Sequence, residues 1–355
     1  MKIGICQINP TVGAINKNKK LILENYDRSV SLGAELVVFP ELAITGYPPQ
    51  DLLLREQFLT NTENALDEIV KCASTPMILG STLVENSHLF NCSFLCENGK
   101  IVGHYKKILL PTYDVFDEDR YFKSGSETSV FELTISGQSK RIGLQICEDL
   151  WDHNYSKDLA ESIKETGADI IINISASPFG DDRLTERSKL IKAKAQKTSL
   201  PFVYCNMVGS QDELIFDGQS LVYGQDGNLI AKGKAFEEDL LIVDLKETNQ
   251  INLPSMKREE SLYKALILGV KDYFSKTGHH QAVIGLSGGI DSSLTACIAV
   301  EALGKDNVYG ISMPSKFSSS HSMSDAQVLA GNLGVDFREI PINSIVESFE
   351  ALMAP

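Results

Sequence analysis

The sequence predicts an α/β protein built of two domains. Short apolar runs with the length of buried strands alternate with amphipathic segments that have the period of helices. The chain has 355 residues, which is more than a single domain usually contains. Its composition changes once, in a polar stretch that contains Pro254 and has no period. We therefore expect a first domain at residues 1–245, a linker at 246–260 and a second domain at 261–355.

The strands expected in the first domain are spread along its whole length. They lie at residues 3–8, 36–39, 76–82, 91–95, 100–106, 141–146, 169–173, 201–206, 221–223, 229–231 and 240–245. Helices are expected at 16–32, where Gly33 ends the period, and at 183–199. Residues 97–99 and 225–228 have the composition of turns between neighbouring strands.

The second domain has the pattern of a parallel α/β unit. A helix is expected at 261–274, followed by strands and helices in alternation at 282–286, 294–300, 308–313, 324–333 and 337–340. Strands that are separated by helices form parallel sheets. This region is only about half the usual size of a domain, so we expect it to be incomplete.

Composition and charge exclude several classes of function. Lysine and arginine total 33 against 47 acidic residues, a formal charge of −14, which argues against binding driven by a nucleic-acid backbone. The seven cysteines show no metal-type spacing, which favours a reduced, cytoplasmic protein. No apolar run is long enough to span a membrane, and the first eight residues predict a strand and not a signal peptide.

One heptapeptide in the second domain predicts a phosphate site. Leu286 ends an apolar strand and is followed by Ser287, Gly288, Gly289, Ile290, Asp291, Ser292 and Ser293, at the start of a helix. Glycines let backbone N–H groups approach an anion, and the helix dipole adds to the attraction. Asp291 would repel a phosphate unless a cation such as Mg²⁺ lies between them. The alternative is an ordinary strand-to-helix turn capped by serine.

Three reactive side chains of the first domain follow three different expected strands. Glu41 follows the strand at 36–39, Lys107 the strand at 100–106, and Cys147 the strand at 141–146. A thiol nucleophile needs a base to accept its proton and a cation to stabilise the developing oxyanion. Taken singly, Cys147 fits a core residue, Glu41 a helix cap and Lys107 a surface charge. Taken together, the three contexts favour a catalytic site.

These segments resemble known families. Phe39-Pro40-Glu41, the stretch from Tyr105 to Pro111, and Ile146-Cys147-Glu148-Asp149 resemble the Glu-Lys-Cys triad of the nitrilase superfamily. The heptapeptide resembles the pyrophosphate loop of ATP pyrophosphatases. Longer stretches resemble glutamine-dependent NAD⁺ synthetases, and they lie at residues 41–53, 110–122, 313–320 and 325–326.

The resemblance implies both a fold and roles for individual residues. The fold would be a four-layer α-β-β-α sandwich followed by part of a doubly wound parallel α/β domain. Glu41 would be the general base, Cys147 the nucleophile, Lys107 the oxyanion stabiliser and Glu118 an orienting carboxylate. The residues that would bind glutamine are Tyr113, Ser177, Arg183 and, as an aromatic wall, Trp151. A surface arginine and a core tryptophan are the alternatives for the last two.

The implied reaction uses glutamine, ATP with Mg²⁺, and deamido-NAD⁺. Ammonia from glutamine would amidate the adenylated carboxylate, so NAD⁺ would be a product and the enzyme would need no redox cofactor. The ATP site would be residues 286–293, with Asp291 on the metal, and the protein is expected to form a homo-oligomer. Members of the family extend beyond this C-terminus, so we expect a fragment.

Three other functions remain open from the sequence. The first is a stand-alone carbon–nitrogen hydrolase, an amidase, with a vestigial nucleotide domain. The second is a non-catalytic regulator that binds nucleotide, and the third is an amidotransferase with a different acceptor. Retention of all three triad members argues against the second.

Overall fold

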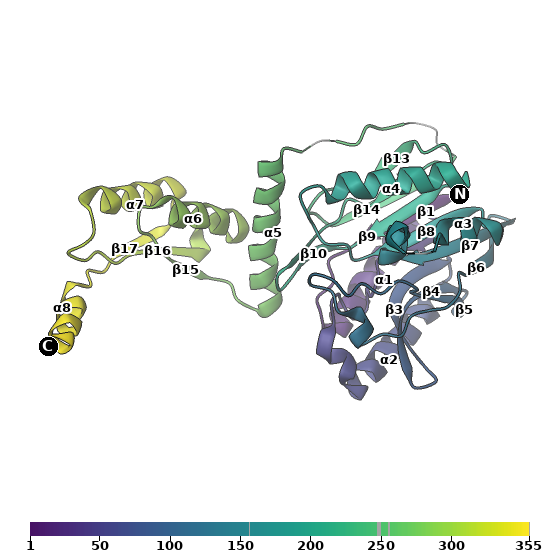
Figure 1. The fold of residues 1–355 in the computed structure, drawn as a ribbon, viewed down its shortest axis with the longest axis horizontal. Coiled ribbons are helices and arrows are strands. Elements are labelled where there is room, and N and C mark those ends of the chain that lie inside the picture. Colours follow the sequence, from purple (N-terminus) through teal and green to yellow (C-terminus); the bar gives the residue numbers. More distant parts are fainter. Residues whose placement is uncertain (156, 247–249, 255, 355) are drawn as a thin grey trace. The chain divides into compact units, whose positions relative to one another are not determined.

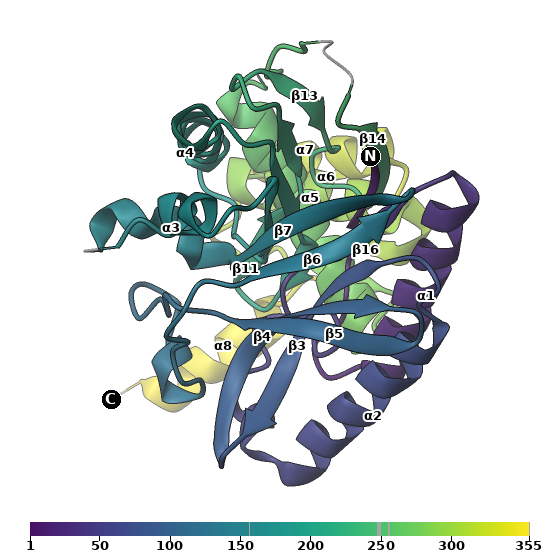
Figure 2. The ribbon, with the colours of Figure 1, turned by 90° about the vertical axis from the view of Figure 1, so that its right-hand side faces the viewer.

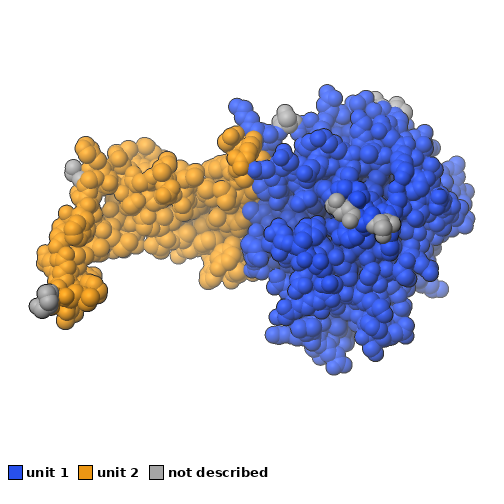
Figure 3. All heavy atoms as spheres, viewed as in Figure 1, with its two compact units in different colours: residues 1–257 blue, residues 258–355 orange. Residues whose placement is uncertain are grey.

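The computed structural model describes residues 1–155, 157–246, 250–254 and 256–354. It contains two compact units, Met1–Lys257 and Arg258–Pro355, which Figure 3 shows in different colours. Residues 247–249 and 255 of the expected linker lie outside the described residues, and the first helix of unit 2 begins at Arg258.

Unit 1 contains two six-stranded sheets (Figures 1 and 2). The first sheet has the order β14-β1-β2-β3-β4-β5, formed by Asp239–Asp244, Lys2–Gln7, Leu36–Val38, Met77–Glu85, His88–Glu97 and Lys100–Lys106. The second has the order β13-β12-β9-β8-β7-β6, formed by Leu229–Lys232, Leu221–Tyr223, Phe202–Asn206, Ile170–Ser175, Gln138–Ile146 and Val130–Ile135. A hairpin of β10 (Val208–Gln211) and β11 (Leu214–Asp217) stands apart from both.

Two pairs of helices cover the outer faces of these sheets. Helices α1 (Ile15–Ser31) and α2 (Glu56–Cys72) pack on the first sheet, through contacts with β1 and β3. Helices α3 (Leu159–Glu165) and α4 (Arg183–Thr198) pack on the second, through contacts with β7, β9 and β12. Short 3₁₀ turns lie at η1 (Gln50–Leu54), η2 (Glu118–Arg120) and η3 (Cys147–Asn154).

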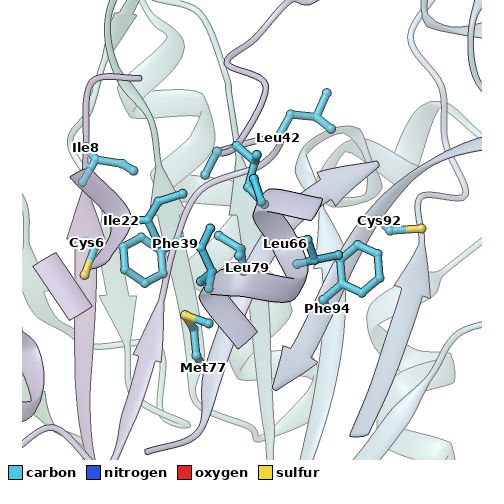
Figure 4. Close-up of a cluster of buried hydrophobic side chains, with 14 of the residues drawn as sticks. Cys6, Ile8, Ile22, Phe39, Leu42, Leu66, Met77, Leu79, Cys92 and Phe94 are labelled. Atoms are coloured by element: carbon cyan, nitrogen blue, oxygen red, sulfur yellow. The ribbon is translucent and has the colours of Figure 1, made fainter. Parts of the chain in front are cut away.

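The side-chain alternation of the strands produces three separate apolar cores. In β8, Ile170, Ile172 and Ile174 belong to the core between the sheets, whereas Ile171 belongs to the core under α3 and α4. Successive residues of a strand point to opposite faces, so a strand buried on both faces is apolar throughout. Figure 4 shows part of the third core, in which Ile22 of α1 and Leu66 of α2 lie with residues of the first sheet such as Met77. Three cores between four layers confirm the predicted α-β-β-α sandwich.

The strand directions bring several strand ends to one edge of the first sheet. Strands β1, β2 and β3 are parallel, and β3, β4 and β5 are successively antiparallel. Consequently β5 runs in the same direction as β2, and their carboxyl ends lie at the same edge. In the second sheet β7, β8 and β9 are also parallel. Glu41, Lys107 and Cys147 all follow such carboxyl ends.

Unit 2 is a three-stranded parallel sheet with helices. The order β15-β16-β17 joins Ala282–Gly285, Val308–Ser312 and Asp336–Glu339. The helices are α5 (Arg258–Thr277), α6 (Ile290–Leu303), α7 (Ser320–Leu333) and α8 (Asn343–Met353), with a 3₁₀ turn η4 at Lys305–Asn307. Leu286, Ala296, Ala326 and Ala330 form its small core. The predicted parallel α/β arrangement is confirmed. Among the described residues no helix has the length and hydrophobicity to cross a membrane.

Candidate active site

Glu41, Lys107 and Cys147 are all buried in unit 1, and the charges of Glu41 and Lys107 both act on the thiol of Cys147. Nζ of Lys107 donates to Oε1 of Glu41 at 2.7 Å, and to Oε1 and Oε2 of Glu118 at 2.8 and 2.9 Å. Glu41 is 0% exposed and Lys107 is 1% exposed. The ammonium of Lys107 therefore binds two carboxylates in the protein interior, and carboxylate oxygens accept all three of these hydrogen bonds.

Glu41 is also fixed by two neutral donors. Its Oε1 accepts from the side-chain amide of Asn91 at 2.8 Å, and its Oε2 accepts from the backbone N–H of Ala176 at 2.9 Å. Asn91 lies on β4, next to β5 and Lys107, while Ala176 follows β8 of the other sheet. Glu41 is thus held from both sheets.

Charge and burial set the protonation of this group. Burial works against the charged form of Lys107, but the carboxylates of Glu118 and Glu41 raise its pKa well above the usual value, so it stays an ammonium. Burial raises the pKa of Glu118 to about 7, even though Lys107 opposes the shift. Tyr47 donates to Oε1 of Glu118 at 2.8 Å and so fixes this second carboxylate.

Cys147 stands at the start of η3, directly after β7. It is 8% exposed, and its φ of 44° is in the left-handed region, which non-glycine residues rarely adopt. Burial and then Glu41 raise the pKa of its thiol, while Lys107 opposes the shift. A thiol in this environment is protonated at neutral pH, so it needs a base before it attacks a substrate.

Two of the residues expected to bind glutamine, Tyr113 and Arg183, interact with a further carboxylate, Glu148. The hydroxyl groups of Tyr113 and Tyr155 donate to Oε2 and Oε1 of Glu148 at 2.9 and 3.2 Å. The guanidinium of Arg183 lies 4.9 Å from the ring centre of Trp151. Burial and then the carboxylate of Glu148 raise the pKa of the Tyr113 hydroxyl, with a smaller contribution from Cys147, while Arg183 opposes the shift.

Ser177, the fourth residue expected to bind glutamine, is buried. Asn206 accepts from its backbone N–H at 2.9 Å and donates to its carbonyl oxygen at 3.3 Å. Arg187, which is fully buried, reaches its hydroxyl at 3.4 Å and pairs with Asp217 at 3.2 Å. The segment that carries Ala176 and Ser177 is therefore fixed at both its backbone and its side chain.

The predicted phosphate loop of unit 2 lies between β15 and α6. Gly288 has φ of 77°, and a Cβ atom there would meet the carbonyl oxygen of Ser322 at 2.1 Å. Ser287 and Ser292 share a hydrogen bond of 3.1 Å, and the hydroxyl of Ser293 donates to the carbonyl oxygen of Gly289 at 2.8 Å. A hollow of about 390 Å³ beside the loop is lined by Leu286 and Ser287, and on its other sides by residues 311–314, 317–319, 322 and 323.

Asp291 is exposed in the first turn of α6 and does not point into the core. The described residues contain no group of three acidic, histidine or cysteine side chains placed to hold a metal ion. A single exposed carboxylate nevertheless fits Mg²⁺, which keeps several waters and takes its remaining ligands from substrate phosphates.

Several residues of the pocket were not predicted from the sequence. Asn91 and Asn206 belong to no recognisable motif, and Tyr47 lies in the stretch 41–53 but was given no role; only the folded chain brings them to the site. Glu148 could have been found, because it is adjacent to Cys147 and carries the charge that an amino group would need.

Comparison with known proteins agrees with this geometry. The carbon–nitrogen hydrolase family matches residues 2–250, and the NAD synthase family matches residues 262–355. The chain belongs to the carbon–nitrogen hydrolase family, and it continues into a region of the NAD synthase type.

Individual relatives carry the same two regions. The glutamine-dependent NAD⁺ synthetase of Synechocystis sp. is 40% identical over 99% of this chain, which spans 66% of that relative. A glutamine-dependent NAD⁺ synthetase structure from Acinetobacter baumannii, in complex with ADP, aligns with a TM-score of 0.92 at 32% identity, covering 99% of this chain and 66% of that one. An amidase structure from Nesterenkonia sp. shares the fold of unit 1, with a TM-score of 0.61 at 23% identity, covering 69% of this chain and 90% of that one.

Proposed function

We propose that this chain belongs to a glutamine-hydrolysing NAD⁺ synthetase, with the glutaminase site in unit 1 and the ATP-binding loop in unit 2. The observation that carries the proposal is the buried contact of Lys107 with Glu41 beside Cys147, in a chain that continues into the loop at 287–293. The chain spans 66% of the length of the Synechocystis relative, so the two activities are tested separately.

In the proposed glutaminase reaction, Glu41 accepts the thiol proton of Cys147. The sulfur attacks the side-chain carbonyl carbon of glutamine, and Lys107 stabilises the oxyanion. The carbon–nitrogen bond then breaks, the leaving amine takes the proton from Glu41, and ammonia departs. Water, with Glu41 again as base, cleaves the thioester to glutamate and restores the thiol. Glu118 orients Lys107 through its two short contacts.

Substrate recognition rests on the two charges of a free amino acid. The guanidinium of Arg183 suits the α-carboxylate of glutamine, and the carboxylate of Glu148 suits its α-ammonium. Tyr113 places Glu148, and Trp151 lies against Arg183. Ser177 is the remaining residue proposed to bind glutamine.

In unit 2 the proposed ligand is ATP. The loop from Leu286 to Ser293 would hold its phosphates, and Asp291 would bind Mg²⁺, which neutralises phosphate charge. Adenylation of the deamido-NAD⁺ carboxylate, followed by attack of ammonia, gives NAD⁺, AMP and pyrophosphate. No redox cofactor takes part. We further propose a cytoplasmic protein that forms a homo-oligomer and binds neither nucleic acid nor membranes.

Two assays test the proposal. The chain incubated with glutamine should release glutamate and ammonia in equal amounts. The chain incubated with glutamine, ATP, Mg²⁺ and deamido-NAD⁺ tests for NAD⁺ and AMP, and Asp291→Ala should remove any such synthesis while hydrolysis persists. Hydrolysis of glutamine no faster than of simple aliphatic amides would contradict the glutaminase assignment.

The alternative, a stand-alone amidase with a vestigial nucleotide unit, is favoured by one observation. The fold of unit 1 matches 90% of the chain of an amidase from Nesterenkonia sp.. Such an enzyme has no need for charged recognition of a free amino acid. Arg183→Gln should therefore raise the KM for glutamine strongly and leave the KM for propionamide unchanged if the glutaminase proposal is right.

A further inference from the structure

Asp149 is a fully buried carboxylate that takes no part in the reaction proposed above. It lies in the 3₁₀ turn η3, two residues after Cys147. Four hydrogen-bond donors converge on it. Oδ1 accepts from the backbone N–H groups of Ile108 at 3.3 Å and Leu109 at 2.9 Å. Oδ2 accepts from the hydroxyl of Tyr105 at 2.7 Å and from the backbone N–H of Ile146 at 2.9 Å.

These donors belong to two segments only. Tyr105, Ile108 and Leu109 flank Lys107 on both sides, and Ile146 immediately precedes Cys147. The two segments come from different sheets, since Lys107 follows β5 and Cys147 follows β7. One side chain thus joins the backbone beside the ammonium to the backbone beside the thiol.

The chemistry of a carboxylate suits this task. An ionised carboxylate offers about four lone pairs, and hydrogen bonds to a charged acceptor are shorter and stronger than neutral ones. Burial raises the pKa of Asp149 to about 6, and the donors at Ile146 and Leu109 oppose that shift, so the group is ionised at neutral pH. The bond from Ile146 also anchors the turn in which Cys147 adopts its left-handed φ of 44°, a conformation that needs support from its surroundings.

We propose that Asp149 is a positioning residue, which holds Lys107 and Cys147 at the separation that the reaction requires. It acts only through the two segments that it joins. This inference rests on the proposed function, because it assigns Lys107 and Cys147 their roles in amide hydrolysis.

The test variant is Asp149→Asn, which keeps the shape of the side chain. The amide oxygen of asparagine can accept hydrogen bonds on one side only. Its NH₂ group cannot accept, so the donors on the other side lose their partner. A displacement of about 1 Å between reacting groups costs about 100-fold in rate. We expect kcat for glutamine hydrolysis to fall about 100-fold, with KM changed by less than about threefold. The rate at which iodoacetamide alkylates Cys147, followed by peptide mass spectrometry, should also fall.

Asp152→Asn is the matched control. Asp152 is a buried carboxylate of the same turn, but it binds the backbone N–H of Leu159 and the ammonium of Lys194, and so joins the turn to α3 and α4. This variant should lower the melting temperature and leave kcat within about threefold of the wild type. A purely structural role for Asp149 predicts the same behaviour for both variants, and that result would overturn the proposal.

A third variant covers failure of Asp149→Asn to fold. Tyr105→Phe removes one of the four donors and should lower kcat about fivefold with KM unchanged. An unchanged kcat in this variant would overturn the proposal. If the wild-type chain hydrolyses no glutamine, the proposed function fails by itself, whereas the alkylation rates still test whether Asp149 positions Cys147.

Discussion

The ammonium of Lys107 lies 2.7 Å from the carboxylate of Glu41, and both side chains are shielded from solvent. A charge is costly to bury unless it is paired, and here the second carboxylate of Glu118 lies on the same ammonium. The ammonium of Lys107 therefore stabilises two buried carboxylates, in addition to its proposed role in catalysis. The two effects can be separated by experiment.

Replacement of Lys107 should show the structural effect. Lys107→Met leaves Glu41 and Glu118 facing one another without a cation, and we expect a loss of about 3–5 kcal/mol in the free energy of unfolding at pH 7.5. Lys106→Met is the control, because Lys106 forms a partly exposed pair with Glu85 and should cost at most about 1 kcal/mol. Urea unfolding measures both. Equal losses in the free energy of unfolding would show that the buried ion pair stabilises the fold no more than the partly exposed one.

The loss caused by Lys107→Met should depend on pH. Lys107 opposes the rise in the pKa of Glu118, so without the ammonium that pKa should rise further and the folded variant should bind a proton more readily than the unfolded chain. Its stability should then increase as the pH falls from 7.5 to 5.5, and the gap to the wild type should narrow. A difference in the free energy of unfolding between wild type and variant that stays the same at both pH values would contradict this explanation.

Removal of the nucleophile should abolish hydrolysis while the fold is retained. Cys147→Ala should reduce glutamine hydrolysis by at least about 10⁴-fold, since no other group in the pocket can form the thioester. Cys72→Ala controls for loss of a thiol, because Cys72 is exposed on α2. Mass spectrometry of the wild type with glutamine should detect the glutamyl adduct on Cys147. Residual hydrolysis in Cys147→Ala near the wild-type rate would rule out this nucleophile.

Glu118 should contribute a pH dependence of known sign. Burial raises its folded pKa to about 7, so its contribution to stability is fully present below the unfolded pKa of about 4.3 and is lost as the pH rises through 7. Between pH 5 and pH 8 the wild type should therefore lose stability relative to Glu118→Gln. Urea unfolding of both proteins at several pH values gives the difference. A difference that grows in favour of the wild type as the pH rises would contradict the raised pKa.

Gly288 should tolerate no side chain. Gly288→Ala combines a φ of 77° with a contact of 2.1 Å to the carbonyl oxygen of Ser322. Gly334→Ala has a left-handed φ of 69° and ψ of 29°, and its Cβ would meet only the flexible side chain of Lys305 at 3.4 Å, so it isolates the conformational cost, about 1–2 kcal/mol. We expect the first variant to lose distinctly more stability in unit 2, measured by amide hydrogen exchange of β15 and α6. Equal losses of stability in the two variants would mean that the loop can move to relieve the contact with Ser322.

The sequence predicted most of the strands and the residues at their ends, but not β6, β10 or β11. The apolar run at 170–172 indicates a strand buried on both faces, because period-2 alternation disappears when both faces are covered. Helix α2 was not predicted, although Phe58, Ala65, Leu66 and Ile69 of its buried face have the spacing of a helix. Glu41, Lys107 and Cys147 were found through their positions after strands and through resemblance.

Tertiary structure alone decided which of these residues meet. Glu41 and Lys107 are 66 residues apart, and they come into contact because β2 and β5 end at one edge of the first sheet. The N–H of Ala176 reaches Glu41 across 135 residues, only because the second sheet packs face to face on the first. The four donors on Asp149 come from two sheets as well. Local sequence specifies strands and turns through periodicity, but the partners of a buried polar group depend on how whole sheets pack, and no local pattern records that.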